Sequence, residues 1–425
     1  MDSINRAKYP FIFYAFAFLF AACPFEYIHP VSLLSWFGIL SLPVIIVIAG
    51  WFMLNTGIKF NMNPLFGLML FMVFWFFLTT LFSVRPDVSF KESLTFARLI
   101  VFVIIISICF TNSWDERYFE PLSSWFVFVF ATLSLSTLTD IFGITKFSPY
   151  EFGQIVHRQA GLLRGGVSGA LMPVVFLPFV YYKILGFLKA GKILPSLLLL
   201  TLVLTGFVST FLLASWSATF AYFLVSLLSV GYILIKLKSN VKYLFLFLSV
   251  TIIFLASPFI NKAFLSYRDI GRVVDKFASL VTVRVIDGQV YSEDNSIGER
   301  AGLIQIAKTH FFQHPFLGIG KGTFFVLNGK TSHNNYAQMF AETGLIGGIL
   351  FILVTLVILA YLVAGLKDSR NGAFWFFLIN SFLVTVITLA VESYIQLKLF
   401  WVFIIPFAVF ARNRKMERHS QAKIQ

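Results

Sequence analysis

The residue with the clearest chemical capacity is His333, which lies in TSHNNYAQMFAETGLIGGIL, residues 331–350. A polar segment passes there into an apolar stretch that is compatible with a membrane helix from Tyr336 onward. Either Asn334 or Asn335 could cap that helix by accepting a hydrogen bond from a backbone N–H of its first turn. An imidazole with a pKa near ~6.5 can take a proton at neutral pH, so this position suits a general base. The alternative is an ordinary polar residue at a membrane surface.

Two more cationic side chains precede His333 in the same half of the chain. Arg300 lies in GERAGLIQIA, where apolar residues at near-helical spacing predict an amphipathic helix over residues 297–312. Lys321 lies in HPFLGIGKG, residues 314–322, whose proline and glycines predict a turn that returns the chain to the membrane. That glycine pattern lacks the strand-turn-helix context of a nucleotide-binding loop. Arg300 is the better candidate to reach the membrane surface beside His333, whereas Lys321 is either near the substrate or solvated.

Another basic segment, residues 146–170, reads KFSPYEFGQIVHRQAGLLRGGVSGA. Arg158 and Arg164 lie there close to the predicted start of a membrane span. The guanidinium group of arginine presents a fork of N–H donors that matches phosphate, so both are candidate phosphate-binding residues. An interfacial pair whose side chains extend to water is the alternative that the residues leave open.

The composition predicts an all-α, polytopic membrane protein. Hydrophobic residues make up 58% of the 425 residues and charged residues only 12%. A span needs about 20 mostly apolar residues, and by this criterion we expect about twelve spans. They centre on residues 10–28, 32–54, 65–83, 94–111, 122–143, 167–188, 193–213, 215–235, 243–259, 344–365, 374–391 and 397–411.

Basic residues predict the orientation of these spans. If the N-terminus is cytoplasmic, nearly every short basic loop and the tail from Arg412 lie on the cytoplasmic side. Residues 144–166 and 260–343 are then external, which in a bacterium means periplasmic. The formal net charge of +14 is largely this positive-inside signal. It gives little support to nucleic-acid binding, because no compact basic domain is present.

Three motifs occur in order between Gly298 and Gly348: GERAGLIQIA, HPFLGIGKG and SHNNYAQMFAETGLIGG. In order and spacing they resemble the C-terminal signature of the O-antigen ligase and O-antigen polymerase superfamily. Members are bacterial membrane glycosyltransferases that act on polyprenyl-linked glycans. The resemblance covers about an eighth of the chain, and the rest is similar only in its pattern of membrane helices.

The resemblance implies a donor, a chemistry and a set of site residues. The donor would be an undecaprenyl diphosphate-linked glycan, and the acceptor the hydroxyl of lipid A-core or of another glycan. His333 would be the general base and Arg300 would stabilise the departing diphosphate, with Arg158, Arg164, Lys321 and Tyr336 as candidate substrate-binding residues. No metal or other cofactor is expected, because diphosphate is already a good leaving group. Glu342 could orient a neighbour by hydrogen bonding or act structurally in its helix.

One position departs from the superfamily. Many members carry a Ser-Arg pair at an external turn near the position of LLASWSATFAYF, where this chain has Trp216 in place of the arginine. Tryptophan supplies no positive charge and is an ordinary interfacial anchor. The diphosphate would then be bound by other arginines, such as Arg158 or Arg164.

The sequence therefore predicts a GT-C-like bundle of about twelve transmembrane helices with one large, partly helical periplasmic loop. We expect an N-terminal bundle at 1–259, the loop at 260–343, C-terminal helices at 344–411 and a basic cytoplasmic tail at 412–425. The expected activity is O-antigen ligation to lipid A-core at the bacterial inner membrane, with the site facing the periplasm. Repeat-unit polymerisation of O-antigen or exopolysaccharide, transfer to protein, and a non-enzymatic transporter of lipid-linked glycans remain open.

Overall fold

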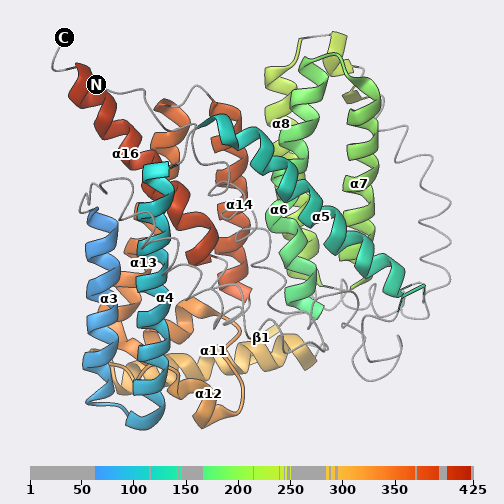
Figure 1. Ribbon diagram of the computed structural model, residues 1–425. Helices are drawn as coiled ribbons and strands as arrows, with labels where there is room; N and C mark the ends of the chain where they lie inside the picture. Colours follow the sequence, from blue (N-terminus) through green and yellow to red (C-terminus); the bar gives the residue numbers. More distant parts are fainter. Residues whose placement is uncertain are drawn as a thin grey trace.

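The structure, a computed structural model, describes residues 63–113, 116–141, 144–145, 166–213, 215–238, 240–243, 245–246, 249, 284–286, 289–291, 295–368, 371–391 and 400–422. Within these ranges the chain is almost entirely helical, and seven helices are long and apolar enough to cross a membrane (Figure 1). These seven are α4 (Pro86–Ser113), η3 with α5 (Glu116–Tyr118 and Phe119–Ile141), α6 (Gly166–Lys189), α7 (Ile193–Leu212), α8 (Trp216–Lys236), α13 (Asn335–Asp368) and α14 (Gly372–Val391). The chain is a multi-pass membrane protein.

The predicted spans agree with the observed helices wherever the structure describes them. The shorter apolar helix α3 (Pro64–Thr80) coincides with the span predicted at 65–83. The span predicted at 397–411 corresponds to the π-helical turn η4 (Phe400–Ile404), which continues as α16 (Ile405–Ala422) into the basic tail. The spans predicted at 10–28 and 32–54, and most of that at 243–259, lie outside the described residues. The total of twelve therefore stays a prediction.

Helix α6 lies at the centre of one side of the bundle, in contact with α5, α7, α8 and α14. Nearly every side chain from Ala170 to Leu185 is buried. Aromatic rings fill much of the adjoining space; those of Phe119 and Phe374, for example, stack with centroids 4.0 Å apart. Such packing fixes helix positions in lipid, where the hydrophobic effect between helices is absent.

Short elements close one end of the bundle. Helix α11 (Asn295–Gln313) runs across the lower ends of the long helices in Figure 1, with α12 (Thr323–Asn328) beneath them. The strands β1 (Arg284–Ile286) and β2 (Gln289–Tyr291) form an antiparallel pair in which Val285 faces Val290. The helix predicted at 297–312 is thus confirmed as α11, although Ile304 on its predicted apolar face is exposed.

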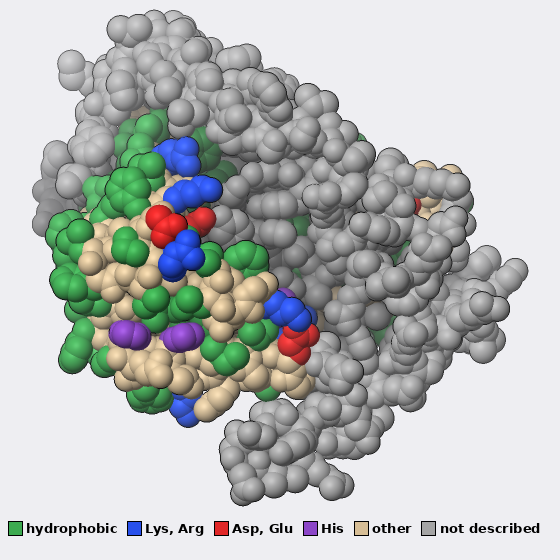
Figure 2. All heavy atoms as spheres, turned by 90° about the horizontal axis from the view of Figure 1, so that it is seen from below, with side chains coloured by type: hydrophobic (Ala, Val, Ile, Leu, Met, Phe, Trp, Pro, Cys, Tyr) green, Lys and Arg blue, Asp and Glu red, His purple; other side chains and the backbone are tan. Residues whose placement is uncertain are grey.

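The two ends of the bundle differ in charge. Because the long helices alternate in direction, the turns after α6, α8 and α13 and the end of α16 lie opposite α11 and α12 (Figure 1). These turns carry Lys189, Lys192, Lys236, Lys367 and Arg414. Seen from the α11 end, charged and histidine side chains lie among hydrophobic side chains and other polar or backbone atoms (Figure 2). Phe312, Phe316 and Phe325, in and next to α11 and α12, are exposed. Charged groups beside exposed apolar rings are typical of a membrane interface.

Candidate active site

His333 lies directly before α13, at the end of the bundle closed by α11. The side-chain Oδ1 of Asn334 accepts a hydrogen bond from the backbone N–H of Ala337 at 2.9 Å, so Asn334 caps the helix as one of the two predicted candidates. The backbone of His333 has φ 52° and is the one non-glycine residue with positive φ among the described residues. This left-handed conformation is uncommon outside glycine, and it turns the chain sharply into the helix.

Helix α13 is broken nine residues after it begins. Gly344 has φ 68° and ψ −169°, a conformation outside the helical region and essentially limited to glycine. The HPFLGIGKG segment, residues 314–322, inserts beside this break and pairs with its backbone groups. The backbone N–H groups of Ile319 and Gly320 donate to the carbonyls of Ala341 (3.0 Å) and Glu342 (2.8 Å). The N–H of Leu345 donates to the carbonyl of Pro315 (2.7 Å). Nε1 of Trp75 donates to the carbonyl of Thr343 (2.9 Å).

The glycines of both motifs permit this close approach. A Cβ atom on Gly344 would lie 2.1 Å from the carbonyl oxygen of Phe316, and one on Gly318 would lie 2.4 Å from the carbonyl carbon of Glu342. Gly344 does not continue the helix. It instead breaks the helix, because another backbone occupies the space that a side chain would need. The predicted turn at 314–322 is present, and it supplies hydrogen-bond partners for the backbone groups at the break.

The positive charge of Arg300 acts on His333 from α11. Burial of the half-buried imidazole lowers its pKa below the usual value, and Arg300 and Lys330 lower it further. Glu299 acts in the opposite direction, and Lys330 forms an ion pair with it. That ion pair lowers the pKa of the Glu299 carboxyl. The net result favours a neutral imidazole at neutral pH, which is the form that can accept a proton.

The two ring nitrogens of His333 have different surroundings. Nδ1 is buried and has no hydrogen-bond partner within the described part of the chain. A substrate outside the protein surface cannot reach a buried atom. A neutral imidazole that carries its hydrogen on Nδ1 has Nε2 free to accept a proton.

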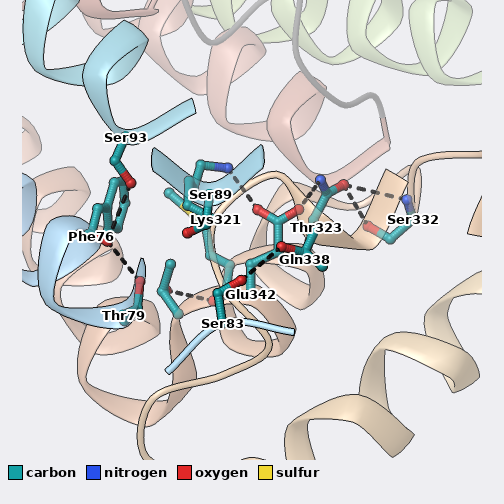
Figure 3. A network of polar contacts seen from close by, with 12 residues as sticks. Phe76, Thr79, Ser83, Ser89, Ser93, Lys321, Thr323, Ser332, Gln338 and Glu342 are labelled. Carbon is teal, nitrogen blue, oxygen red and sulfur yellow. Dashed lines mark hydrogen bonds and ion pairs between the residues drawn. The ribbon is translucent and has the colours of Figure 1, made fainter. Parts of the chain in front are cut away.

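A buried polar network extends from the HPFLGIGKG segment to the turn at His333 (Figure 3). Nζ of Lys321 lies 2.7 Å from Oε2 of Glu342, whose side chain has no exposed area. The other carboxylate oxygen of Glu342 accepts a hydrogen bond from Nε2 of Gln338 at 2.9 Å. Oε1 of Gln338 in turn lies 3.4 Å from both the backbone nitrogen and the hydroxyl of Ser332. Glu342 thus forms a hydrogen bond with a neighbour, which fits both roles that the sequence left open for it.

The remaining predicted site residues fall in different places. The ring of Tyr336 packs against Phe351, with centroids 5.4 Å apart. Arg158 and Arg164 lie outside the described residues. Trp216 is the first residue of α8. Among the described residues no group of three or more His, Cys, Asp or Glu side chains could hold a metal ion.

Sequence reasoning missed Ser332 and Gln338. Both are polar residues next to a predicted membrane helix, where burial of such a side chain is costly unless it is hydrogen-bonded. Gln338 lies one helical turn before Glu342, a spacing at which glutamine and a carboxylate meet on one helix face. This spacing was the available signal.

Residues 196–352 match the family described as O-Antigen ligase. Over these residues the chain is similar to the O-antigen ligase and polymerase superfamily. The matched segment runs from α7 to the first part of α13 and contains Arg300, Lys321 and His333. Comparison with curated proteins gives no match. The chain is thus similar to glycosyltransferases of the O-antigen ligase or polymerase type, with lipid-linked glycans as the implied substrates.

Proposed function

We propose that the protein transfers a glycan from undecaprenyl diphosphate to the hydroxyl of lipid A-core, as an O-antigen ligase of the bacterial inner membrane. The observation that carries this proposal is the placement of His333. This residue lies two positions before α13, within the matched O-antigen ligase segment and at the end of the bundle opposite the basic turns, and the charge of Arg300 acts on its imidazole. On the positive-inside rule this end faces the periplasm, where lipid-linked O-antigen and lipid A-core meet.

In the proposed reaction Nε2 of His333 takes the proton of the acceptor hydroxyl. The acceptor oxygen forms a bond to the anomeric carbon as the bond from that carbon to the diphosphate oxygen breaks. General base catalysis of this kind is typically worth about 10²–10⁴ in rate. The neutral state of the imidazole, favoured by burial and by Arg300, makes the base available at neutral pH.

Arg300 is the proposed partner of the departing diphosphate. A guanidinium group stabilises the negative charge that develops on the leaving oxygens. Diphosphate leaves readily once neutralised, so the proposed mechanism requires no metal ion. A single displacement inverts the anomeric centre, and NMR of the product linkage tests this; retention would contradict it.

Arg158 and Arg164 complete the proposal as residues that bind the diphosphate, because Trp216 cannot supply charge at its own position. Tyr336 and Lys321 remain candidates for substrate contact. The proposed architecture keeps about twelve spans, a periplasmic loop over residues 260–343 and a cytoplasmic tail from residue 412.

The test is a transfer assay in membranes with a defined undecaprenyl diphosphate-linked glycan. Lipid A-core and a second lipid-linked repeat unit are offered separately to the wild type, His333→Ala and the control His310→Ala. His310 lies on α11, with its ring 6.0 Å from that of Phe324, and has no proposed role in catalysis. Product on lipid A-core that disappears only in His333→Ala supports the proposal.

Other outcomes identify the alternatives. Lengthened lipid-linked chains would identify a polymerase, which the family match covers equally. Product on protein would identify a protein oligosaccharyltransferase. Glycan movement without transfer would identify a transporter. Full activity of His333→Ala would show that the proposed base is wrong.

A further inference from the structure

We propose that Ser332 and Gln338, held by the Lys321–Glu342 ion pair, are positioning residues that fix the imidazole of His333 for proton transfer. The inference rests on the proposed role of His333 as the base. It assigns a function to Ser332 and Gln338, which have no role of their own in the proposed reaction.

The first step is the turn itself. The hydroxyl of Ser332 donates to the carbonyl of Asn334 at 2.7 Å and accepts from the backbone N–H of Asn334 at 3.2 Å. These bonds connect the residues on either side of His333, whose left-handed backbone costs free energy relative to ordinary conformations. A side chain that closes the turn on both sides therefore keeps His333 in a conformation that it would otherwise leave.

The second step is the orientation of the Gln338 amide. An ionised carboxylate only accepts hydrogen bonds, so Glu342 requires the NH₂ group of Gln338 to face it. The amide oxygen then points to Ser332, where it lies 3.4 Å from the backbone nitrogen. It lies at the same distance from the hydroxyl, whose one hydrogen already bonds to the carbonyl of Asn334 at 2.7 Å. All three side chains are buried, so water cannot replace these contacts at low cost. The carboxylate thus determines how Ser332 is held.

The third step is the fixed position of that carboxylate. Lys321 comes from the segment that satisfies the break in α13, and its side chain is only 13% exposed. Two backbone bonds already join this segment to Ala341 and Glu342. The ion pair adds a side-chain contact at the same place. Lys321 accordingly influences the reaction through Glu342, which explains why the HPFLGIGKG and SHNNYAQ motifs occur together.

Charge effects on His333 come from elsewhere. In the described part of the chain, three groups act electrostatically on the imidazole. They are Arg300 and Glu299 on α11 and Lys330 in the loop between α12 and α13. None belongs to the network of Lys321, Glu342, Gln338 and Ser332. Neutral substitutions in the network therefore change the geometry of the base without removing a charge that acts on it.

The experiment compares Ser332→Ala and Gln338→Met with Ser381→Ala, a matched control. Ser381 is also buried, and its hydroxyl donates to the carbonyl of Phe377 at 3.3 Å within α14. We measure kcat, KM for an undecaprenyl diphosphate-linked glycan and the pH dependence of kcat/KM, all per molecule of monodisperse protein. A misplacement near 1 Å can cost about 10²-fold in rate. We therefore expect kcat to fall by about tenfold to a hundredfold in both variants, with KM nearly unchanged.

The pH dependence provides a readout that a purely structural role would not move. A relaxed turn admits water to the imidazole, so the acidic limb of kcat/KM moves to higher pH in Ser332→Ala and stays in place in Ser381→Ala. If both network variants keep the kcat and the acidic limb of Ser381→Ala, the positioning role is overturned. Loss of protein yield alone, with kcat per folded molecule unchanged, also overturns it.

His333→Ala separates this inference from the proposed function. An inactive His333→Ala with fully active Ser332→Ala and Gln338→Met leaves the base in place and removes the positioning role. A fully active His333→Ala removes the base itself, and the positioning inference with it.

Discussion

Helices α6 and α13 depart from regular helix formation in opposite ways. Helix α6 contains Pro173 and Pro178 and is still one continuous helix, although each proline removes a backbone donor. Helix α13 contains no proline between Asn335 and Asp368 and is nevertheless broken at Gly344. Four packed helices surround α6, whereas a turn with backbone hydrogen-bonding groups of its own lies beside α13.

The difference shows what a helix break in lipid requires. Free backbone groups within a membrane must find partners inside the protein. In α13 the partners come from residues 315–320 and from Trp75, so the break forms where another backbone can approach. Packing against neighbouring helices keeps α6 continuous, whereas hydrogen bonds to another segment of the chain stabilise the break in α13. The break lies at the end of the bundle that carries the proposed base.

The largest expected effect comes from filling the space at the break. Gly344→Ala places a Cβ atom 2.1 Å from a backbone oxygen in a conformation that alanine rarely adopts. We expect a loss of at least about 3 kcal/mol of unfolding free energy and no detectable transfer. The control is Gly186→Ala on α6, where nothing lies within 4 Å and the change should stay within about 1 kcal/mol. Thermal unfolding in detergent compares them, and equal midpoints would contradict our account of the break.

The next largest loss of unfolding free energy is expected from Lys321→Met, which leaves the fully buried Glu342 carboxylate without its cation. Breaking a buried pair typically costs about 3–5 kcal/mol. Lys330→Met is the control, because the ion pair of Lys330 with Glu299 is exposed and worth less than about 1 kcal/mol. The double variant Lys321→Met/Glu342→Gln should recover most of the lost thermal stability. A double variant no more stable than Lys321→Met would argue against the charge imbalance as the cause.

Trp75→Phe tests one hydrogen bond at the break. The change removes the Nε1 donor and leaves the buried carbonyl of Thr343 without it. We expect a cost of about 1–3 kcal/mol in unfolding free energy, measured by thermal unfolding. Trp125→Phe is the control, because Trp125 is partly exposed on the side of α5. The two variants should differ; if they do not, Trp75 contributes packing alone.

The smallest expected effects are opposite shifts in pH dependence. Protonated His333 cannot act as a base, so kcat/KM falls as the pH drops through the pKa of the imidazole. Arg300 lowers that pKa and Glu299 raises it. The acidic limb should therefore move to higher pH in Arg300→Gln and to lower pH in Glu299→Gln, whatever each change does to the overall rate. If the acidic limb moves in the same direction in both variants, a group other than His333 determines it.

Sequence patterns predicted much of this fold because each rests on local chemistry. Apolar runs located the helices α3 to α8, α13 and α14, and the spacing in residues 297–312 located α11. The position of His333 before a cap at Asn334 also followed from neighbouring residues. The break at Gly344 did not, since helix-contact glycines and a helix-breaking glycine read alike until the backbone of Phe316 is seen beside it. The Lys321–Glu342 contact, between two separate motifs, likewise required the tertiary structure.

The chain separations at the break also bear on the order of folding. Pro315 and Leu345, which share a hydrogen bond, are about 30 residues apart, whereas Trp75 and Thr343 are separated by 268. Closing a loop costs more chain entropy as the loop lengthens, so the contact between Pro315 and Leu345 costs less to form than that between Trp75 and Thr343. The turn at residues 315–320 can thus close on the first part of α13 before α3 docks. The N-terminal bundle would then meet a region around His333 that is already partly assembled.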